Sequence, residues 1–223
     1  MMKPLVVIAS VLMLTACGNN SSTSSPTSSA TSGASSSEAP AAPAAAAGDA
    51  KTASAQNGNW KMIPELSRVT FTATQTGDKF TGEFKRFTTF IQLDPSDLAD
   101  AHIEATIDIS SVDAKDEQRN QALPGSEWFG VSQFPTAVFR SDSIKKLDNG
   151  MYEAVGKLTI KDVTKDVALP FTLDIDGDKA RAFGEVKLTR TDFKVGTGEW
   201  ESGKWVGLDV TVTFDITATR VGT

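Results

Sequence analysis

The sequence contains one cysteine and one histidine among its 223 residues. A single cysteine excludes an internal disulfide and a cysteine-rich zinc site. The lone histidine, His102, lies on the polar face of an alternating segment and has no cysteine or second histidine with which to share a metal. We therefore interpret it as a surface residue and predict no metal site. Because the chain also lacks a nucleophile-elbow motif, we predict no catalytic residues and no enzymatic activity.

The chain has no surplus of basic residues. Its 22 Lys and Arg stand against 28 Asp and Glu, which gives a formal net charge of -6. The segment before residue 60 contributes nothing to this charge, because Lys3 and Lys51 balance Glu38 and Asp49. Nucleic-acid binding requires a clustered basic face. The charge therefore predicts no nucleic-acid partner, while a small apolar ligand remains open.

The apolar run at the N-terminus ends at the cysteine. Met1 to Lys3 form a positively charged start, and Leu5 to Ala16 form an apolar stretch of signal-peptide length, too short to span a bilayer comfortably. The segment Leu14 to Gly18 resembles the lipobox of bacterial lipoproteins. The resemblance implies that residues 1–16 are a lipoprotein signal peptide and that Cys17 is the lipid-attachment site. The alternatives are an ordinary cleaved signal peptide with an incidental cysteine, or a buried free thiol.

Residues 18–58 are mostly Ser, Thr, Ala, Pro and Gly. Such a composition cannot bury enough apolar surface to offset the entropy of ordering the chain. We predict that residues 17–59 form a lipidated, disordered tether with a mean reach of roughly 35 Å. Gly18 stands where lipoproteins kept at the inner membrane often carry Asp. The resemblance therefore implies a lipid-anchored location in the cell envelope, on the periplasmic face of the outer membrane.

Residues 60–223 have the size of one domain, and a two-residue alternation dominates them. From Leu208 to Ala218 every second residue is apolar, and the residues between them are Asp or Thr. Similar alternation recurs in seven further segments, at 68–74, 79–84, 102–110, 136–143, 152–160, 167–175 and 181–189. Turns that contain Gly or Asn separate several of these segments. The pattern predicts about eight antiparallel strands, joined largely by hairpins.

One segment, Ala114 to Gln133, interrupts the alternation and predicts a short helix followed by a loop, with the helix capped from the Asp113 to Glu117 region. Long antiparallel strands expose free edges unless the sheet closes on itself. We therefore predict an all-β fold: a single antiparallel, up-and-down barrel of about eight strands with a short helix and loop between strands.

A barrel of this size either fills with its own side chains or encloses one small ligand. Gly82, Gly156 and Gly184 lie on otherwise apolar faces. They either leave room for a ligand or mark bends and bulges in a packed sheet. The pattern leaves both interpretations open.

Six segments, in order, are similar to the YceI-like family of lipocalin-like, polyisoprenoid-binding proteins. They are "SRVTF", "FTGEFKRF", "IDISSVDAKDEQRNQAL", "EWFGVSQFPTAVFRSDSI", "GKLTIKDVTKDVALPF" and "LTRTDFKVGTGEW". The resemblance covers residues 60–221 and implies a lipocalin-like barrel that holds an isoprenoid chain, with no other cofactor. "GTGEW" at residues 196–200 brings the chain closer to the branch associated with b-type diheme cytochromes.

The predicted ligand-binding residues come from the inward faces of the strands and from the irregular loop. The strand residues are Phe71, Phe80, Phe84, Ile107, Phe139, Leu158, Phe171, Val186 and Phe214. Trp128 and Phe129 of the loop are predicted to form a lid over the barrel. Each of these residues has an alternative role as plain core.

Three cations, Arg119, Lys157 and Arg190, stand at positions that the family resemblance marks. A cation at the mouth of the barrel, in particular Arg119 or Arg190, would meet a phosphate or quinone oxygen of the ligand. The alternative is a salt bridge to one of the carboxylates Asp192, Asp116 or Glu117.

The leading prediction is therefore an envelope lipoprotein that binds a polyprenyl lipid or an isoprenoid quinone inside a barrel, as a carrier, storage or sequestering module. The alternative is an interaction module with a solid barrel core, which docks an envelope membrane protein such as a b-type cytochrome through Trp200 and Trp205. The oligomeric state is left open, including a dimer.

Overall fold

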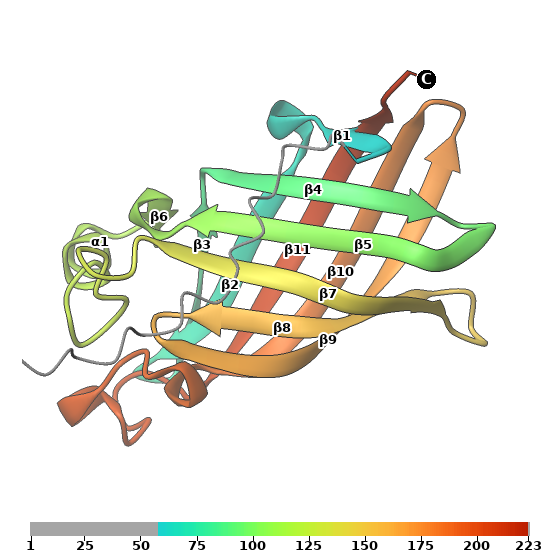
Figure 1. Cartoon of the computed structure of the whole chain (residues 1–223). Coiled ribbons are helices and arrows are strands. Elements are labelled where there is room, and N and C mark those ends of the chain that lie inside the picture. Colours follow the sequence, from blue (N-terminus) through green and yellow to red (C-terminus); the bar gives the residue numbers. More distant parts are fainter. Residues whose placement is uncertain (1–57, 223) are drawn as a thin grey trace, which may run out of the picture. The chain divides into compact units, whose positions relative to one another are not determined.

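The computed structural model describes residues 58–222, and most of this segment is β-strand (Figure 1). The strands are β1 (Trp60–Met62), β2 (Arg68–Gln75), β3 (Asp78–Phe84), β4 (Phe87–Asp94), β5 (Asp97–Asp108), β6 (Val112–Asp113), β7 (Thr136–Lys146), β8 (Tyr152–Ile160), β9 (Val163–Asp176), β10 (Lys179–Thr189) and β11 (Asp209–Arg220). The helical elements are α1 (Glu117–Ala122) and the 3-10 turns η1 (Pro64–Leu66), η2 (Ile109–Ser111), η3 (Arg190–Phe193) and η4 (Gly198–Trp200). Within this part of the chain no helix has the length and apolar character that crossing a membrane requires. The predicted signal peptide, Cys17 and the tether up to residue 57 lie outside the described residues.

Eight strands close into an antiparallel barrel. Strands β4, β5, β7, β8, β9, β10 and β11 pair with one another in that order, and β1 pairs with both β4 and β11. In Figure 1, β4, β5, β7 and β8 form one wall, and β10 and β11 cross behind it. Closure leaves no free edge around the ring. The prediction of an all-β antiparallel barrel of about eight strands is confirmed.

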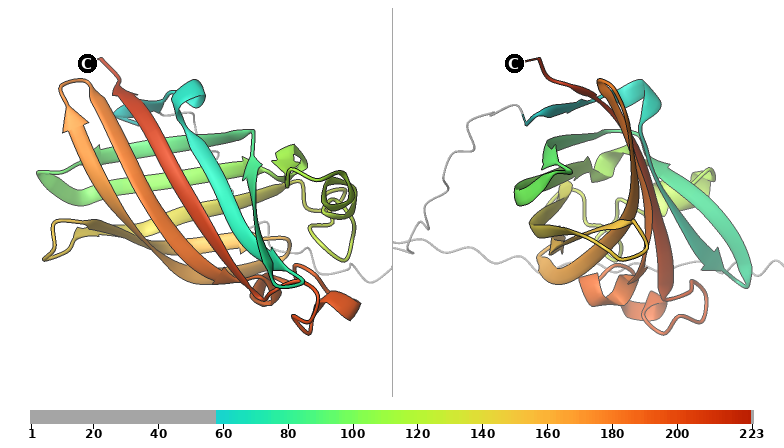
Figure 2. Two further views of the ribbon diagram at one scale, coloured as in Figure 1. Left: turned by 180° about the vertical axis from the view of Figure 1, so that it is seen from behind. Right: turned by 90° about the vertical axis from the view of Figure 1, so that its right-hand side faces the viewer.

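Strand β11 is shared between two partners on the same side. Its last residues, Ala218 to Arg220, pair with β1, whereas Thr211 to Asp215 pair with β2. β2 and β3 form a hairpin, and the outer edge of β3 pairs with the short strand β6. The hairpin extends the wall toward the end of the barrel that carries α1, as Figure 2 shows from behind and from the side.

Two strands of the ring, β1 and β4, escaped the sequence prediction. β4 does alternate, with Phe87, Ile91 and Leu93 on the inward face, but Phe90 is apolar on the outward face and obscures the pattern. β1 has three residues, too few to show any period.

The irregular segment agrees with its prediction. α1 begins after Asp116, whose side chain accepts a hydrogen bond from the backbone N–H of Arg119 at 3.0 Å. An aspartate in this position satisfies one of the backbone donors that a helix start leaves unpaired. The short helix, its cap and the following loop are confirmed.

The glycines on the apolar faces mark close approach rather than spare room. A Cβ atom at Gly156 would lie 2.1 Å from the carbonyl oxygen of Arg140, next to the register shift between Ser141 and Ser143. At Gly82 and Gly184 an added Cβ would meet a phenylalanine ring of the neighbouring strand within 2.5 Å. All three positions therefore follow the interpretation in which glycine permits tight packing or a bulge.

Candidate functional site

An apolar cavity of about 510 Å³ lies inside the barrel. Every strand of the ring contributes to its wall, and so does the hairpin of β2 and β3. Ligand-binding cavities commonly have volumes of about 300–1,000 Å³. The interior therefore has the size and the character of a site for an apolar small molecule.

The inward side chains of β11 show that the interior is hollow. Val210, Val212, Phe214 and Ile216 all line the cavity, yet each is only partly buried. Among residues 58–222 no large side chain is completely enclosed. In a barrel filled by its own side chains these residues would be fully packed. The alternative function included a barrel with a solid core, and that prediction is therefore wrong.

One end of the cavity is closed by buried residues, which form its floor. Trp60 is 3% exposed, and its indole Nε1 donates a hydrogen bond to the carbonyl oxygen of Leu93 at 2.9 Å. The guanidinium of Arg220 lies 4.4 Å from the centre of the Trp60 ring. Tyr152 stacks on Phe171, with ring centres 5.6 Å apart. These residues are barely accessible to solvent and belong to one buried cluster at this end of the barrel.

The other end is covered by α1, the loop after it and the segment 190–208, which lie together on one side of the barrel in Figure 1. Trp128 lies 5.6 Å from Trp200 between ring centres, and Phe129 lies 6.1 Å from Phe84. Both predicted lid residues therefore lie over this end and line the cavity. We call this end the mouth.

All thirteen residues that we predicted to bind ligand line this one cavity. They are Phe71, Phe80, Phe84, Ile107, Arg119, Trp128, Phe129, Phe139, Leu158, Phe171, Val186, Arg190 and Phe214. Their contact with a ligand stays a prediction. The cavity is also lined by residues of β1 and β4 and by several at the mouth that we did not predict, among them Trp60, Phe87, Ile91, Leu93, Leu123 and Phe193.

Arg190 differs from both roles that we predicted for it. It is 5% exposed and forms no salt bridge with any carboxylate of the described residues. Its five N–H groups donate to five backbone carbonyl oxygens, those of Val195, Gly196, Trp200, Val206 and Gly207. Burial lowers the pKa of the Arg190 guanidinium. The predicted ion pair is wrong, and no N–H group remains for a headgroup, because the side chain organises the loop at the mouth.

Arg119 keeps most of its donors unused. Its Nε donates to the carbonyl oxygen of Ala114 at 3.2 Å, and its Nη1 donates to Oε1 of Gln75 at 3.1 Å. The guanidinium carbon lies 4.3 Å from the centre of the Phe80 ring. The predicted ion pair with Asp116 or Glu117 is wrong, since Asp116 caps α1 instead.

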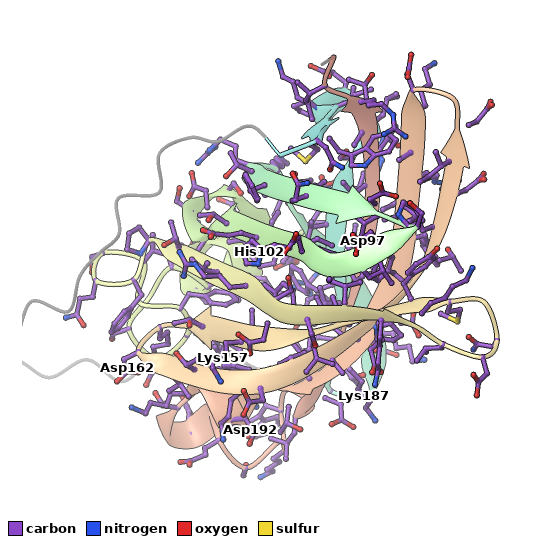
Figure 3. All side chains as sticks on the ribbon, turned by 45° about the vertical axis from the view of Figure 1, so that its right-hand side comes forward. Asp97, His102, Lys157, Asp162, Lys187 and Asp192 are labelled. Atoms are coloured by element: carbon purple, nitrogen blue, oxygen red, sulfur yellow. The ribbon has the colours of Figure 1, made fainter. Side chains whose placement is uncertain are left out.

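Two further polar residues lie on the outer wall of the barrel, as Figure 3 shows. Lys157 forms a salt bridge with Asp166 at 2.7 Å, a carboxylate that we did not predict as its partner. His102 is half-buried: its Nδ1 lies 3.0 Å from the carbonyl oxygen of Ser141, and its ring lies 6.0 Å from that of Phe90. The predicted surface position of His102 agrees with the structure, but its ring is less exposed than we expected, because the bulge at Ser141 brings a backbone carbonyl to it.

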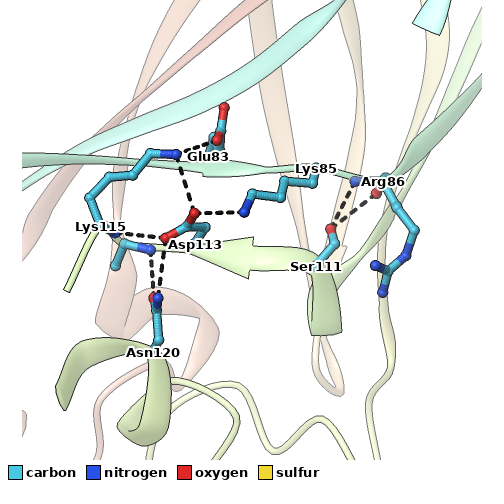
Figure 4. A network of polar contacts seen from close by, with 8 residues as sticks. Glu83, Lys85, Arg86, Ser111, Asp113, Lys115 and Asn120 are labelled. Atoms are coloured by element: carbon cyan, nitrogen blue, oxygen red, sulfur yellow. Dashed lines mark hydrogen bonds and ion pairs between the residues drawn. The ribbon is translucent and has the colours of Figure 1, made fainter. Parts of the chain in front are cut away.

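A polar network fastens α1 and β6 to β3 (Figure 4). Asp113 accepts from Nζ of Lys85 at 2.7 Å, from the backbone N–H of Lys115 at 2.9 Å and from Nδ2 of Asn120 at 3.1 Å. The Lys115 ammonium also bridges Asp113 and Glu83. These donors, Lys85 foremost, hold the pKa of Asp113 well below its usual range. The network therefore positions α1, which is part of the cover of the mouth.

The two tryptophans predicted as surface anchors differ in their environment. Trp200 lines the cavity, and its indole N–H donates to Oε2 of Glu127 at 3.2 Å. Trp205 is 46% exposed. Only Trp205 is placed as a surface anchor would be.

Comparison with known proteins places this barrel in a family. The model of the YceI-like domain matches residues 60–218. Protein YceI of Salmonella arizonae is 31% identical over 137 residues, which are 59% of this chain and 71% of that protein.

Solved structures agree with the sequence match. The crystal structure of Burkholderia cenocepacia BcnA is 31% identical with a TM-score of 0.69, covering 71% of this chain and all of BcnA. A polyisoprenoid-binding domain from Saccharophagus degradans, implicated in plant cell wall breakdown, is 12% identical with a TM-score of 0.59, covering 73% of this chain and 99% of that domain, and shows the fold alone. The cavity, the lipocalin-like barrel and these matches lead to one conclusion: the chain belongs to the YceI-like family.

Proposed function

We propose that this protein binds a long apolar isoprenoid, either a polyprenyl lipid or an isoprenoid quinone, and serves as a carrier, storage or sequestering module. The observation that carries the proposal is the cavity, whose wall is apolar except for Thr89 and for the polar residues at the mouth. Burial of apolar surface contributes roughly 25 cal/mol per Å². A linear, methyl-branched tail gains this contribution along its whole length without leaving a polar atom unpaired. The role is therefore one of binding rather than catalysis.

The proposal includes attachment to a membrane. The lipobox-like segment around Cys17 and the composition of residues 18–58 support an acyl anchor followed by a tether. Gly18 supports the periplasmic face of the outer membrane as the location. The Saccharophagus domain, which is described as polyisoprenoid-binding, supports the ligand class only at the level of the fold.

The test is to produce the full chain with its signal peptide in a bacterial envelope and to identify the bound lipid by native mass spectrometry and organic extraction. We expect one long-chain prenyl compound per protein. A cavity-filling variant, Ala182→Trp, should lose the compound, because Ala182 lines the wall. The matched control is Glu185→Trp, which adds the same bulk to the exposed face of β10.

Protein that carries no prenyl compound, with water in the cavity at high resolution, would contradict the proposal. So would an Ala182→Trp variant that folds and still retains its lipid.

A further inference from the structure

Two of the exposed large apolar side chains in the described part of the chain lie in one loop at the mouth. Trp205 is 46% exposed and Leu208 is 37% exposed, and both lie between η4 and β11. The other two, Leu66 and Phe183, belong to η1 and β10. We call residues 201–208 the outer loop. Single apolar residues are normal on a protein surface, whereas two in one short loop indicate a contact surface.

The outer loop projects from the barrel but has a fixed backbone. In Figures 1 and 2 it lies, in orange-red, beyond the strand ends at the mouth. The carbonyl oxygen of Trp205 accepts from the backbone N–H of Thr76, and the N–H of Gly207 donates to the carbonyl oxygen of Thr74, both at 2.8 Å. Nε of Arg190 donates to the carbonyl oxygen of Gly207 at 2.9 Å. Because the backbone is already ordered, a contact through the Trp205 side chain loses little loop entropy.

The side chain of Trp205 has the chemistry of a residue at a lipid–water interface. Its indole N–H has no acceptor among residues 58–222, unlike those of Trp60 and Trp200. The Lys204 ammonium lies 4.6 Å from the centre of the Trp205 ring. At a membrane surface an indole ring packs against acyl chains while its N–H meets a headgroup, and a neighbouring lysine keeps its ammonium in water.

The size and the charge of the outer loop favour a lipid surface over a protein partner. A stable protein–protein interface buries about 1,200–2,000 Å² in total, and one Trp and one Leu side chain cover only a small part of that area. Glu199 and Glu201 lie in or beside the same loop and outnumber Lys204. The local charge therefore does not attract anionic lipids. These features fit a shallow contact with a neutral, zwitterionic lipid surface.

We propose that the outer loop docks on the surface of a bilayer, with the side chains of Trp205 and Leu208 in the interface between headgroups and acyl chains. The proposed acyl anchor holds the barrel near the membrane, so that a contact that is weak by itself is populated. In this respect the inference rests on the proposed function. It concerns the outer surface of the cover, however, and does not depend on what the cavity holds.

The experiment measures whether Trp205 enters lipid. The full chain is produced with its signal peptide in a bacterial envelope, and the mature protein is mixed with phosphatidylcholine vesicles whose acyl chains carry bromine. Bromine quenches the fluorescence of a tryptophan only at close range. Trp60, Trp128 and Trp200 line the cavity and give the background. The matched control is the double variant Trp205→Ser with Phe183→Trp, which moves the exposed tryptophan to a position of β10 that is 45% exposed.

We expect bromine to quench the wild-type fluorescence, and we expect most of that quenching to be absent in Trp205→Ser and in the double variant. Leu208→Ser should lower the docking equilibrium constant about fivefold, because less apolar surface leaves water. Vesicles that contain anionic phosphatidylglycerol should give no stronger quenching than neutral vesicles. Thermal unfolding at the same temperature establishes that each variant is folded.

Equal quenching in wild-type protein and in the double variant would overturn the docking site. So would the absence of quenching in wild-type protein that mass spectrometry shows to be acylated and that is bound to the vesicles. Mature protein without an acyl chain would overturn the proposed anchor alone; in that case the same protein is titrated with vesicles to millimolar lipid, and a lack of quenching there would overturn the docking site. Quenching confined to anionic vesicles would overturn the preference for a neutral surface. Extraction of bound lipid from the same preparation tests the proposed ligand separately.

Discussion

The two ends of the barrel are closed by different kinds of interaction. At the floor, the buried side chains of Trp60, Tyr152 and Phe171 close the end, and the backbone pairing of β1 with β4 and β11 closes the ring beside them. At the mouth, a six-residue helix and two loops are held by side chains, above all by Asp113 and Arg190. Backbone pairing around a buried core opens only with the whole domain, whereas a cover held by side chains opens locally at a lower cost in free energy. The difference indicates that the mouth, rather than the floor, gives access to the cavity.

The largest expected effect comes from breaking the floor. Trp60→Ala should lower the free energy of unfolding by about 3–5 kcal/mol, because it removes a buried aromatic side chain and leaves a hole. Equilibrium unfolding in urea measures this change. The control is Trp205→Ala, whose exposed side chain should matter little. A similar loss in the free energy of unfolding for the two variants would show that the packing of Trp60 does not stabilise the floor.

A smaller effect should follow from removing the side chain of Arg190, whose hydrogen bonds hold the loop at the mouth. Arg190→Met leaves five carbonyl oxygens without their donor and should cost about 2–4 kcal/mol. Hydrogen exchange should locate the lost protection in residues 195–207, while β1 and β4 remain protected. Arg140→Met, which breaks an exposed ion pair, is the matched control and should change little. Protection lost evenly over the barrel would contradict a local role for Arg190.

The smallest effect concerns pH at the cover of the mouth. Because folding lowers the pKa of Asp113 below the value of about 3.9 typical of a free aspartate, the ionised form stabilises the cover. That contribution is complete above about pH 5 and is lost as the pH falls below about 4. Asp113→Asn should therefore loosen α1 at neutral pH and differ less and less from wild-type protein as the solution becomes acidic.

Amide protection in α1, corrected for intrinsic exchange rates, measures this loosening, with the amides of β1 as the internal reference. A gap between the two proteins that stays constant down to pH 2 would show that the Asp113 carboxylate does not fasten the cover.

The sequence predicted the barrel wall well, because a two-residue period decides which side of a sheet each side chain takes. Phe139, Leu158 and Phe214 could be assigned to the interior on this ground alone. The same reasoning missed β4, where Phe90 breaks the contrast between the two faces, and β1, which is too short to have a period.

The mouth was harder to predict from the sequence. The acceptors of Arg190 are backbone carbonyls from a loop 5 to 17 residues away, and no pattern of side chains indicates them. The glycines were ambiguous for a similar reason. Whether Gly156 leaves room or permits contact depends on the carbonyl of Arg140 across the neighbouring strand, which only the pairing register reveals.

Buried side chains at the floor, among them Trp60 and Phe171, make the barrel a container with one closed end rather than a channel. A ligand with one apolar end would have to enter with that end first. Its polar end would be the last part to enter and the first part to leave. If the proposed function holds, a ligand would enter and leave at the same end of the barrel, beside α1.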